Sequence, residues 1–393
     1  MLKRSHLASA LLLALGACSQ GSTALPRAQG VRVHEWGTYT SVQSSVGASM
    51  EGLHHIEEVL PPFVFARDLA RPMAKGLERT PTQITQKLET PVLYFYGATG
   101  HLSVDVRFPS GVISEWFPDA SSYEPPMSPA VEVAKGRMRW DVELIPSAAA
   151  QPPEVSPDSV WAPSRRVASL GVRVRDQDEG FIFYRGLARF ERPIRVLATG
   201  AGALEIINDS DATIPAAFVL QASTAGGGVV AVGQLGPRAR RSLTAPSPSS
   251  SIASYTGEAK SQLKAALTAS GLYEDEAQAM VDTWSRSYFQ NPGLRVLYIA
   301  PRAWTDELLP ITIDPPPAEL VRTLVGRIEV LAPEEETKIA AELAAAARGE
   351  KPFVVGDYGR FAEPKLRRGL ELLSDEDAKR FTQGMITQLT DMP

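Results

Sequence analysis

The chain has 393 residues, of which 44% are hydrophobic and one is a cysteine, and its formal net charge is −5. This composition is typical of a globular protein and excludes a disordered chain. A mildly acidic chain without a long basic block lacks the positive surface that nucleic acids require, so we expect no nucleic-acid partner. Because one cysteine cannot form a disulfide within the chain, burial of apolar side chains has to hold the fold together.

The first segment has the pattern of an export signal. Lys3 and Arg4 precede an apolar run at residues 7–15, which is too short to span a membrane and is typical of a secretory signal. The sequence Leu-Gly-Ala-Cys that follows, ending at Cys18, resembles the bacterial lipobox. The resemblance implies a signal peptide at residues 1–17 and lipidation of Cys18. Ser19 after the cysteine implies, by the same resemblance, a lipid-anchored protein of the outer membrane.

Residues 18–30 are small and polar, which predicts an unpacked tether. From residue 31 on, apolar and polar residues alternate: Leu102, Val104, Val106 and Phe108, for example, share one face of a predicted strand. Other apolar runs predict strands buried on both faces at 92–96, 181–184, 195–198, 204–207 and 216–220. Many short strands joined by close turns predict an antiparallel β-sandwich over residues 31–243.

A stretch rich in Ser and Pro at residues 244–257 has no periodicity and predicts a linker. Beyond it the period becomes helical, which predicts a mixed, largely helical C-terminal domain over 258–393. The expected helices begin near residues 258, 274, 333, 364 and 375. A strand is expected at 295–300 and another at 320–331, where the spacing also permits a helix. The predicted fold class is therefore α+β.

Several short segments share a further pattern, which opens with His-Glu-Trp-Gly-Thr-Tyr-Thr at residues 34–40. The others are Leu-Glu-Thr-Pro-Val at 88–92, Phe-Pro at 108–109, Glu-Trp at 115–116, Phe-Tyr-Arg-Gly at 183–186, Tyr-Phe at 288–289, Pro-Gly-Leu-Arg at 292–295 and Val-Gly-Arg at 325–327. Together they resemble a family of exported bacterial proteins that opens with His-Glu-Trp-Gly-Thr-Phe-Thr. The resemblance implies a coherent exported protein and no particular activity.

The first candidate site lies in this opening segment. If residues 31–40 form a strand, His34 and Trp36 face one way, and Glu35 faces the other way with the apolar side chains. A carboxylate buried there needs a partner, because an isolated buried charge costs several kcal/mol. Glu35 is then either a metal ligand or general base, or a structural partner of an arginine such as Arg185 or Arg327.

A second histidine group could complete a metal site. His54, His55 and Glu58 fit one or two helical turns, in which residues four apart are neighbours. With His34 and Glu35 they could bind a divalent metal in a hydrolase, or they could be solvated charge pairs. The spacing His-Glu-x-x-His is absent, so the motif itself is weak.

Other patterns admit a binding function. Trp36 and Trp161 are candidates for stacking on a sugar, and Trp161 is expected to be exposed because it lies in a Pro-rich loop. Residues 176–180, Asp-Gln-Asp-Glu-Gly, resemble the start of a calcium loop but also suit a hairpin turn. The motifs of acyl hydrolases, nucleotide hydrolases and dinucleotide enzymes are absent. The first hypothesis is thus an envelope lipoprotein that binds or assembles, with an envelope protein or a glycan as partner. A metal-dependent hydrolase and a carbohydrate-binding module are the alternatives.

Overall fold

The structure is a computed structural model, which describes residues 27–53, 59–67, 83–126 and 133–390. The predicted signal peptide, Cys18 and most of the predicted tether lie outside the described residues, as do His54, His55 and Glu58. The end of the tether belongs to the fold, since the Ala28 amide donates to the His101 carbonyl at 3.0 Å and Ala28 is buried.

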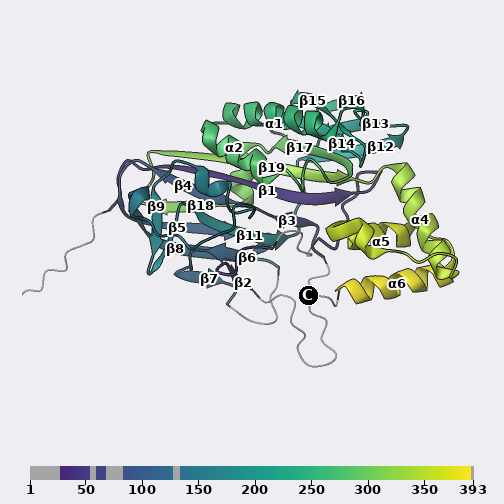
Figure 1. Ribbon diagram of the computed structural model, residues 1–393, viewed down its shortest axis with the longest axis horizontal. Helices are drawn as coiled ribbons and strands as arrows, with labels where there is room; N and C mark the ends of the chain where they lie inside the picture. The colour runs from purple at the N-terminus through teal and green to yellow at the C-terminus, as the bar shows by residue number, and fades with distance from the viewer. Residues whose placement is uncertain (1–26, 54–58, 68–82, 127–132, 391–393) are drawn as a thin grey trace, which may run out of the picture.

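A main sheet of ten strands organises the molecule (Figure 1). Its strands, in spatial order, are β15 (Gly227–Leu235), β14 (Ile214–Ala222), β17 (Gly293–Ile299), β19 (Glu319–Val330), β1 (Arg32–Gln43), β3 (Gln86–Leu88), β11 (Ile182–Ala188), β6 (Gly111–Phe117) and β2 (Phe65–Ala66), while β4 (Val92–Tyr96) pairs with β1 and β11. Almost all neighbours are antiparallel; β1 and β19 run parallel over their full length. Both faces of β1 are buried, which suits its position in the middle of the sheet.

Two smaller sheets complete the β structure. The six-stranded sheet contains β10 (Gln177–Glu179), β9 (Gly171–Val174), β8 (Gly136–Ile145), β5 (Gly100–Phe108), β18 (Ile311–Asp314) and β7 (Ser122–Glu124). The third sheet contains β12 (Ile194–Gly200), β13 (Ala203–Asn208) and β16 (Arg240–Thr244). One face of the main sheet shares a single apolar core with both of them, as the residues Val33, Val104 and Val196 illustrate.

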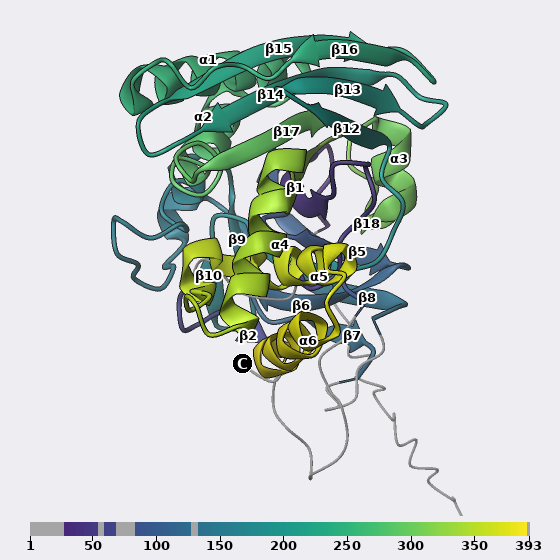
Figure 2. The same ribbon diagram turned by 90° about the vertical axis from the view of Figure 1, so that its right-hand side faces the viewer.

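The helices form two groups. Helices α1 (Ile252–Ala269) and α2 (Glu274–Thr283) pack on the other face of the main sheet through residues such as Leu263 and Met280. Helices α4 (Pro333–Ala347), α5 (Ala362–Leu372) and α6 (Glu376–Thr390) form their own small core at one end of the molecule (Figures 1 and 2). The remaining helical segments are α3 (Arg302–Leu308) and the short turns η1 (Ser147–Ala149), η2 (Ser164–Arg166) and η3 (Val355–Phe361). Within the described residues, no helix has the length and hydropathy that crossing a bilayer requires.

The α+β class is confirmed, and the predicted strands and most predicted helices are present. Two details differ. Helix α1 begins at Ile252, inside the predicted linker, because the Ser251 side chain accepts the Ser254 amide and caps it. The predicted sandwich (31–243) and C-terminal domain (258–393) also share the main sheet, because β17 and β19 lie between β14 and β1. Periodicity shows where a strand is but not which strand it pairs with.

Candidate functional site

Strand β1 directs the predicted site residues to opposite faces of the main sheet. His34 and Trp36 face helices α1 and α2, while Glu35 faces the core shared with the six-stranded sheet. The predicted alternation along residues 31–40 is therefore confirmed. Because neighbouring side chains of a strand point in opposite directions, one metal ion cannot be held by both His34 and Glu35.

His34 has a fixed partner on helix α2. Its Nδ1 lies 2.8 Å from Oε2 of Glu276, and both side chains are buried. Glu276 also accepts from the Tyr96 hydroxyl at 2.8 Å and from the Tyr273 amide at 2.7 Å. The bond from the Tyr273 amide to Glu276 caps the N-terminus of α2, which gives Glu276 a structural role in the first turn of this helix. His34 thus ties β1 to the start of a helix.

Glu35 forms a buried ion pair. Its Oε2 lies 2.5 Å from Nε of Arg322 on β19, and its Oε1 accepts from the Tyr184 hydroxyl. Burial alone would lower the pKa of Arg322, but Glu35 more than offsets this and raises it above its usual range. The structural interpretation of Glu35 holds, although its partner is Arg322 and not Arg185 or Arg327.

The metal site predicted from the histidines is not assembled among the described residues, which contain no group of three or more His, Asp or Glu side chains placed to hold an ion. His54, His55 and Glu58 lie outside them, so a metal at those three residues stays a prediction.

The two tryptophan candidates are both buried. Trp36 is 0% exposed and Trp161 is 3% exposed, so the predicted exposure of Trp161 is wrong. The reason is Glu179, a buried carboxylate that accepts from Trp161 Nε1 at 2.9 Å and pairs with Arg165 at 2.6 Å. Neither indole ring presents a face for a sugar to stack on.

Residues 176–180 form a hairpin and not an ion loop. Val174 pairs with Gln177 across a two-residue turn in which Arg175 has a φ of 56°. The carboxylate of Asp178 is bonded to Arg173 at 2.7 Å, and Glu179 is bonded to Arg165. A turn is therefore present as predicted, but it lies at Arg175 and Asp176 and leads into β10, whereas residues 182–184 belong to the main sheet.

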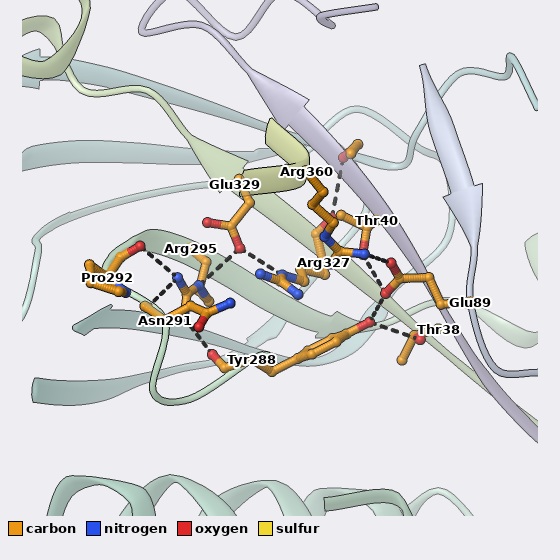
Figure 3. A network of polar contacts seen from close by, with 11 residues as sticks. Thr38, Thr40, Glu89, Tyr288, Asn291, Pro292, Arg295, Arg327, Glu329 and Arg360 are labelled. Atoms are coloured by element: carbon orange, nitrogen blue, oxygen red, sulfur yellow. Dashed lines mark hydrogen bonds and ion pairs between the residues drawn. The ribbon is translucent and has the colours of Figure 1, made fainter. Parts of the chain in front are cut away.

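A different set of side chains forms the most concentrated group of buried charges. It crosses six neighbouring strands and joins residues from distant parts of the chain. Figure 3 shows the part of it around Glu89 and Glu329. We call the following residues the charge network: Arg295 on β17, Arg327 and Glu329 on β19, Thr38 and Thr40 on β1, Lys87 and Glu89 on or just after β3, Arg185 on β11, Glu115 on β6, Tyr288 after α2 and Arg360 on η3.

At one end of the charge network, Glu329 holds two arginines. Its Oε1 accepts from Arg295 Nε at 2.9 Å and from Arg327 Nε at 2.6 Å. Arg295 also donates to the backbone carbonyls of Tyr288 and Asn291, which fixes the chain that follows α2. These two arginines lower the pKa of Glu329, although burial acts in the other direction.

Glu89 is the centre of the charge network. It accepts from Thr40 at 2.9 Å and from the Tyr288 hydroxyl, and it pairs with Arg360 (Figure 3). The Tyr288 ring lies 4.2 Å below the guanidinium of Arg327, which adds a cation–π contact. Burial alone would raise the pKa of Glu89, but Arg360 and Arg327 lower it to about 2. Glu89 is therefore a permanent anion in a cationic environment.

A cavity lies beside Glu89, and we call it the Lys87 cavity. Lys87, Glu89, Arg185, Trp284, Tyr288 and Arg360 are among its lining residues. Burial, reinforced by the nearby Arg185, lowers the pKa of Lys87 to about 7. Val160 and Thr283 line both this cavity and a larger hollow between the loop at 157–163 and the end of α2. The cavity can hold a small polar molecule among buried charges.

Sequence reasoning did not single out the charge network as a site. Lys87 and Arg185 lie in short strands, where a charged residue is normally taken to face the solvent. Arg360 lies in a segment without periodicity. One signal was available. The segments that carry the family resemblance supply Glu89, Glu115, Arg185, Tyr288, Arg295 and Arg327.

Comparison with known proteins gives no family. No protein-family model matches the chain, and no curated protein matches it. Among solved structures, the yeast delta-COP-I mu-homology domain is similar at a TM-score of 0.27 and 9% identity, covering 78% of this chain and 98% of that one. The same domain complexed with Dsl1 WxWxV peptide gives a TM-score of 0.26 and 9% identity, covering 78% and 97%. Scores this low support no argument about fold or function.

Proposed function

We propose that the protein is a lipoprotein of the bacterial outer membrane, anchored through Cys18, and that it binds a small ligand in the Lys87 cavity. The anchor rests on the signal and lipobox pattern at the start of the sequence. Acyl chains supply membrane affinity of about 0.8 kcal/mol for each buried methylene. An envelope protein or a glycan as an additional partner stays a prediction.

The observation that supports a binding site is the charge network itself. Burying ionised groups costs several kcal/mol each, and well-packed apolar residues of the same volume usually stabilise a core better. The charge network nevertheless buries these groups, and Lys87, Glu89 and Arg185 line one cavity together. Titratable groups that have shifted pKa values and line the same cavity are typical of functional sites.

The alternatives gain no support from the described residues. A hydrolase site that uses His34 and Glu35 together is excluded by their opposite orientations, and a sugar site at Trp36 or Trp161 is excluded by burial.

The anchor is tested by cell fractionation. The wild-type chain and Cys18→Ala should be expressed in a bacterial host with an outer membrane, and the inner and outer membranes separated on a density gradient. We expect the wild type in the outer-membrane fraction, with a mass that includes acyl chains, and Cys18→Ala in the soluble fraction. Equal membrane association of both proteins would contradict the proposal.

The binding site is tested by native mass spectrometry of the protein extracted from its own membranes. We expect a small molecule to remain bound to the wild type and to Trp36→Phe, and to be lost from Trp284→Phe. Both tryptophans are buried in the same apolar core, but only Trp284 lines the cavity. A wild-type mass equal to the lipidated polypeptide alone would contradict the proposal.

A further inference from the structure

Two buried N–H groups in the Lys87 cavity lack an acceptor among the described residues. They are Nε of Arg185, whose side chain is 7% exposed, and Nε1 of Trp284, which is 1% exposed. A buried donor left without an acceptor costs about 1–3 kcal/mol, so native proteins rarely keep one. Both residues line the same cavity. A ligand that accepts two hydrogen bonds in this cavity would satisfy both donors.

The charge of the lining selects an anion. Among the described lining residues, Lys87, Arg185 and Arg360 are basic, and Glu89 is acidic. Arg185 uses one terminal nitrogen to bind Glu115 at 2.7 Å, and its Nε is still without an acceptor among the described residues. Hydrogen bonds from cations to an ionised acceptor are about twice as strong as neutral ones.

The size of the cavity selects among anions. The centre of a water molecule can move through about 30 Å³ of it. One water needs about 10–15 Å³ on this measure, so the space holds two or three atoms of that size, and the rest of a ligand has to point out of the cavity. A carboxylate group has three heavy atoms in a plane and two acceptor oxygens, whereas a phosphate group has five heavy atoms in a tetrahedron.

We propose that the Lys87 cavity binds the carboxylate group of a small organic acid, with Arg185 Nε and Trp284 Nε1 as its hydrogen-bond donors. Lys87 and Arg360 also line the cavity, and Arg360 is paired with Glu89. This inference rests on the proposed binding function and adds the chemical class of the ligand.

The experiment uses the full-length protein in detergent micelles and ¹³C-labelled acetate as the probe. Binding is detected as broadening of the acetate NMR line. Unlabelled acetamide, which is neutral, and inorganic phosphate are the competitors, at matched ionic strength. Two variants remove one donor each. Trp284→Phe keeps the ring, and Arg185→Lys keeps the charge next to Glu115. Trp36→Phe is the matched control, since its Nε1 is also buried without an acceptor among the described residues but does not line the cavity.

We expect wild type and Trp36→Phe to bind acetate equally, and each donor variant to bind it at least about tenfold more weakly, as the loss of a hydrogen bond to a charged group implies. Melting curves show which variants fold. If either Trp284→Phe or Arg185→Lys does not fold, the result for the remaining variant decides. Undiminished acetate binding by a folded donor variant would overturn the proposal. So would equal competition by acetamide or by phosphate, or the absence of acetate binding in the wild type. In the last case a co-purified molecule seen by native mass spectrometry would still support the binding function, so the two failures are distinguishable.

Discussion

From the lowered pKa of Lys87 in the cavity we predict how the stability of the protein depends on pH. Lys87 is 4% exposed, and burial together with Arg185 lowers its pKa from 10.5 to about 7. Between these two values the unfolded chain binds a proton that the folded chain does not. The free energy of unfolding therefore rises with pH in this range. Well below pH 7 both states bind the proton, so Lys87 lowers the stability by a constant amount and adds no further pH dependence.

The size of the effect follows from the shift. One pKa unit corresponds to about 1.4 kcal/mol, and at pH 7 the folded lysine is half protonated. Integration from pH 7 to pH 9 gives a gain of about 2 kcal/mol from Lys87. The useful pH range for this measurement ends near pH 9. Tyrosines of the unfolded chain have a pKa of about 10, so above about pH 9 they begin to ionise and add their own effect on stability.

Urea unfolding at pH 7, 8 and 9 measures this gain by linear extrapolation. We expect the stability of the wild type to rise by about 2 kcal/mol over the series, and that of Lys87→Met to stay level. Lys351→Met, which changes an exposed lysine, should keep the wild-type slope. Equal slopes for Lys87→Met and the wild type would refute the assignment of the gain to Lys87.

Two further predictions concern the main sheet. Glu35→Gln should destabilise the protein by about 3–5 kcal/mol in the same urea assay, because it removes the buried carboxylate partner of Arg322 and leaves only the half-exposed Asp306 as its ionised partner. Asp306→Asn removes a 43% exposed partner of the same arginine and should cost less than about 1 kcal/mol; similar losses for the two variants would contradict this argument. Gly326→Ala should cost about 1–3 kcal/mol or more, since the new methyl group would lie 2.4 Å from the buried ring of Tyr298. Gly257→Ala, in open space on α1, should not destabilise, and a larger loss there than at Gly326 would refute the packing argument.

The sequence predicted local structure well because local structure depends on nearby residues. Alternation along residues 31–40 correctly placed Glu35 among apolar side chains and His34 on the opposite face. The turn after Val174 followed from the polar residues there, although it contains Asp176 and not Gly180. In each case the deciding interactions lie within a few residues of one another.

Partners distant in the chain were not predictable in the same way. Arg322 lies 287 residues from Glu35 and reaches it only because β1 and β19 pair in parallel, in a register where the two residues stand opposite each other. A single periodic pattern contains no information about register between strands. The burial of Trp161 has the same origin, since it depends on a loop folding over Glu179.

The charge network shows how a site can be hidden from periodicity and still leave a trace in the sequence. Its charged side chains are spread over several strands and two segments outside strands, and each would be interpreted alone as a solvated residue. Their significance appears only when pairing aligns them: Thr40 faces Lys87 on one side and Arg327 on the other, and Arg185 faces Glu115.

The segments behind the family resemblance gain a physical meaning from this alignment. The segments at 88–92, 115–116, 183–186, 288–289, 292–295 and 325–327 share no periodicity and no local function, yet each supplies a member of the charge network. Buried ionised groups require matched partners, so a change in one member requires a change in another. If the resemblance reflects common ancestry, the shared feature is the charge network and its cavity, not the exposed surface. A relative that keeps these segments should then bind the same class of ligand, and acetate binding measured on such a relative decides whether this holds.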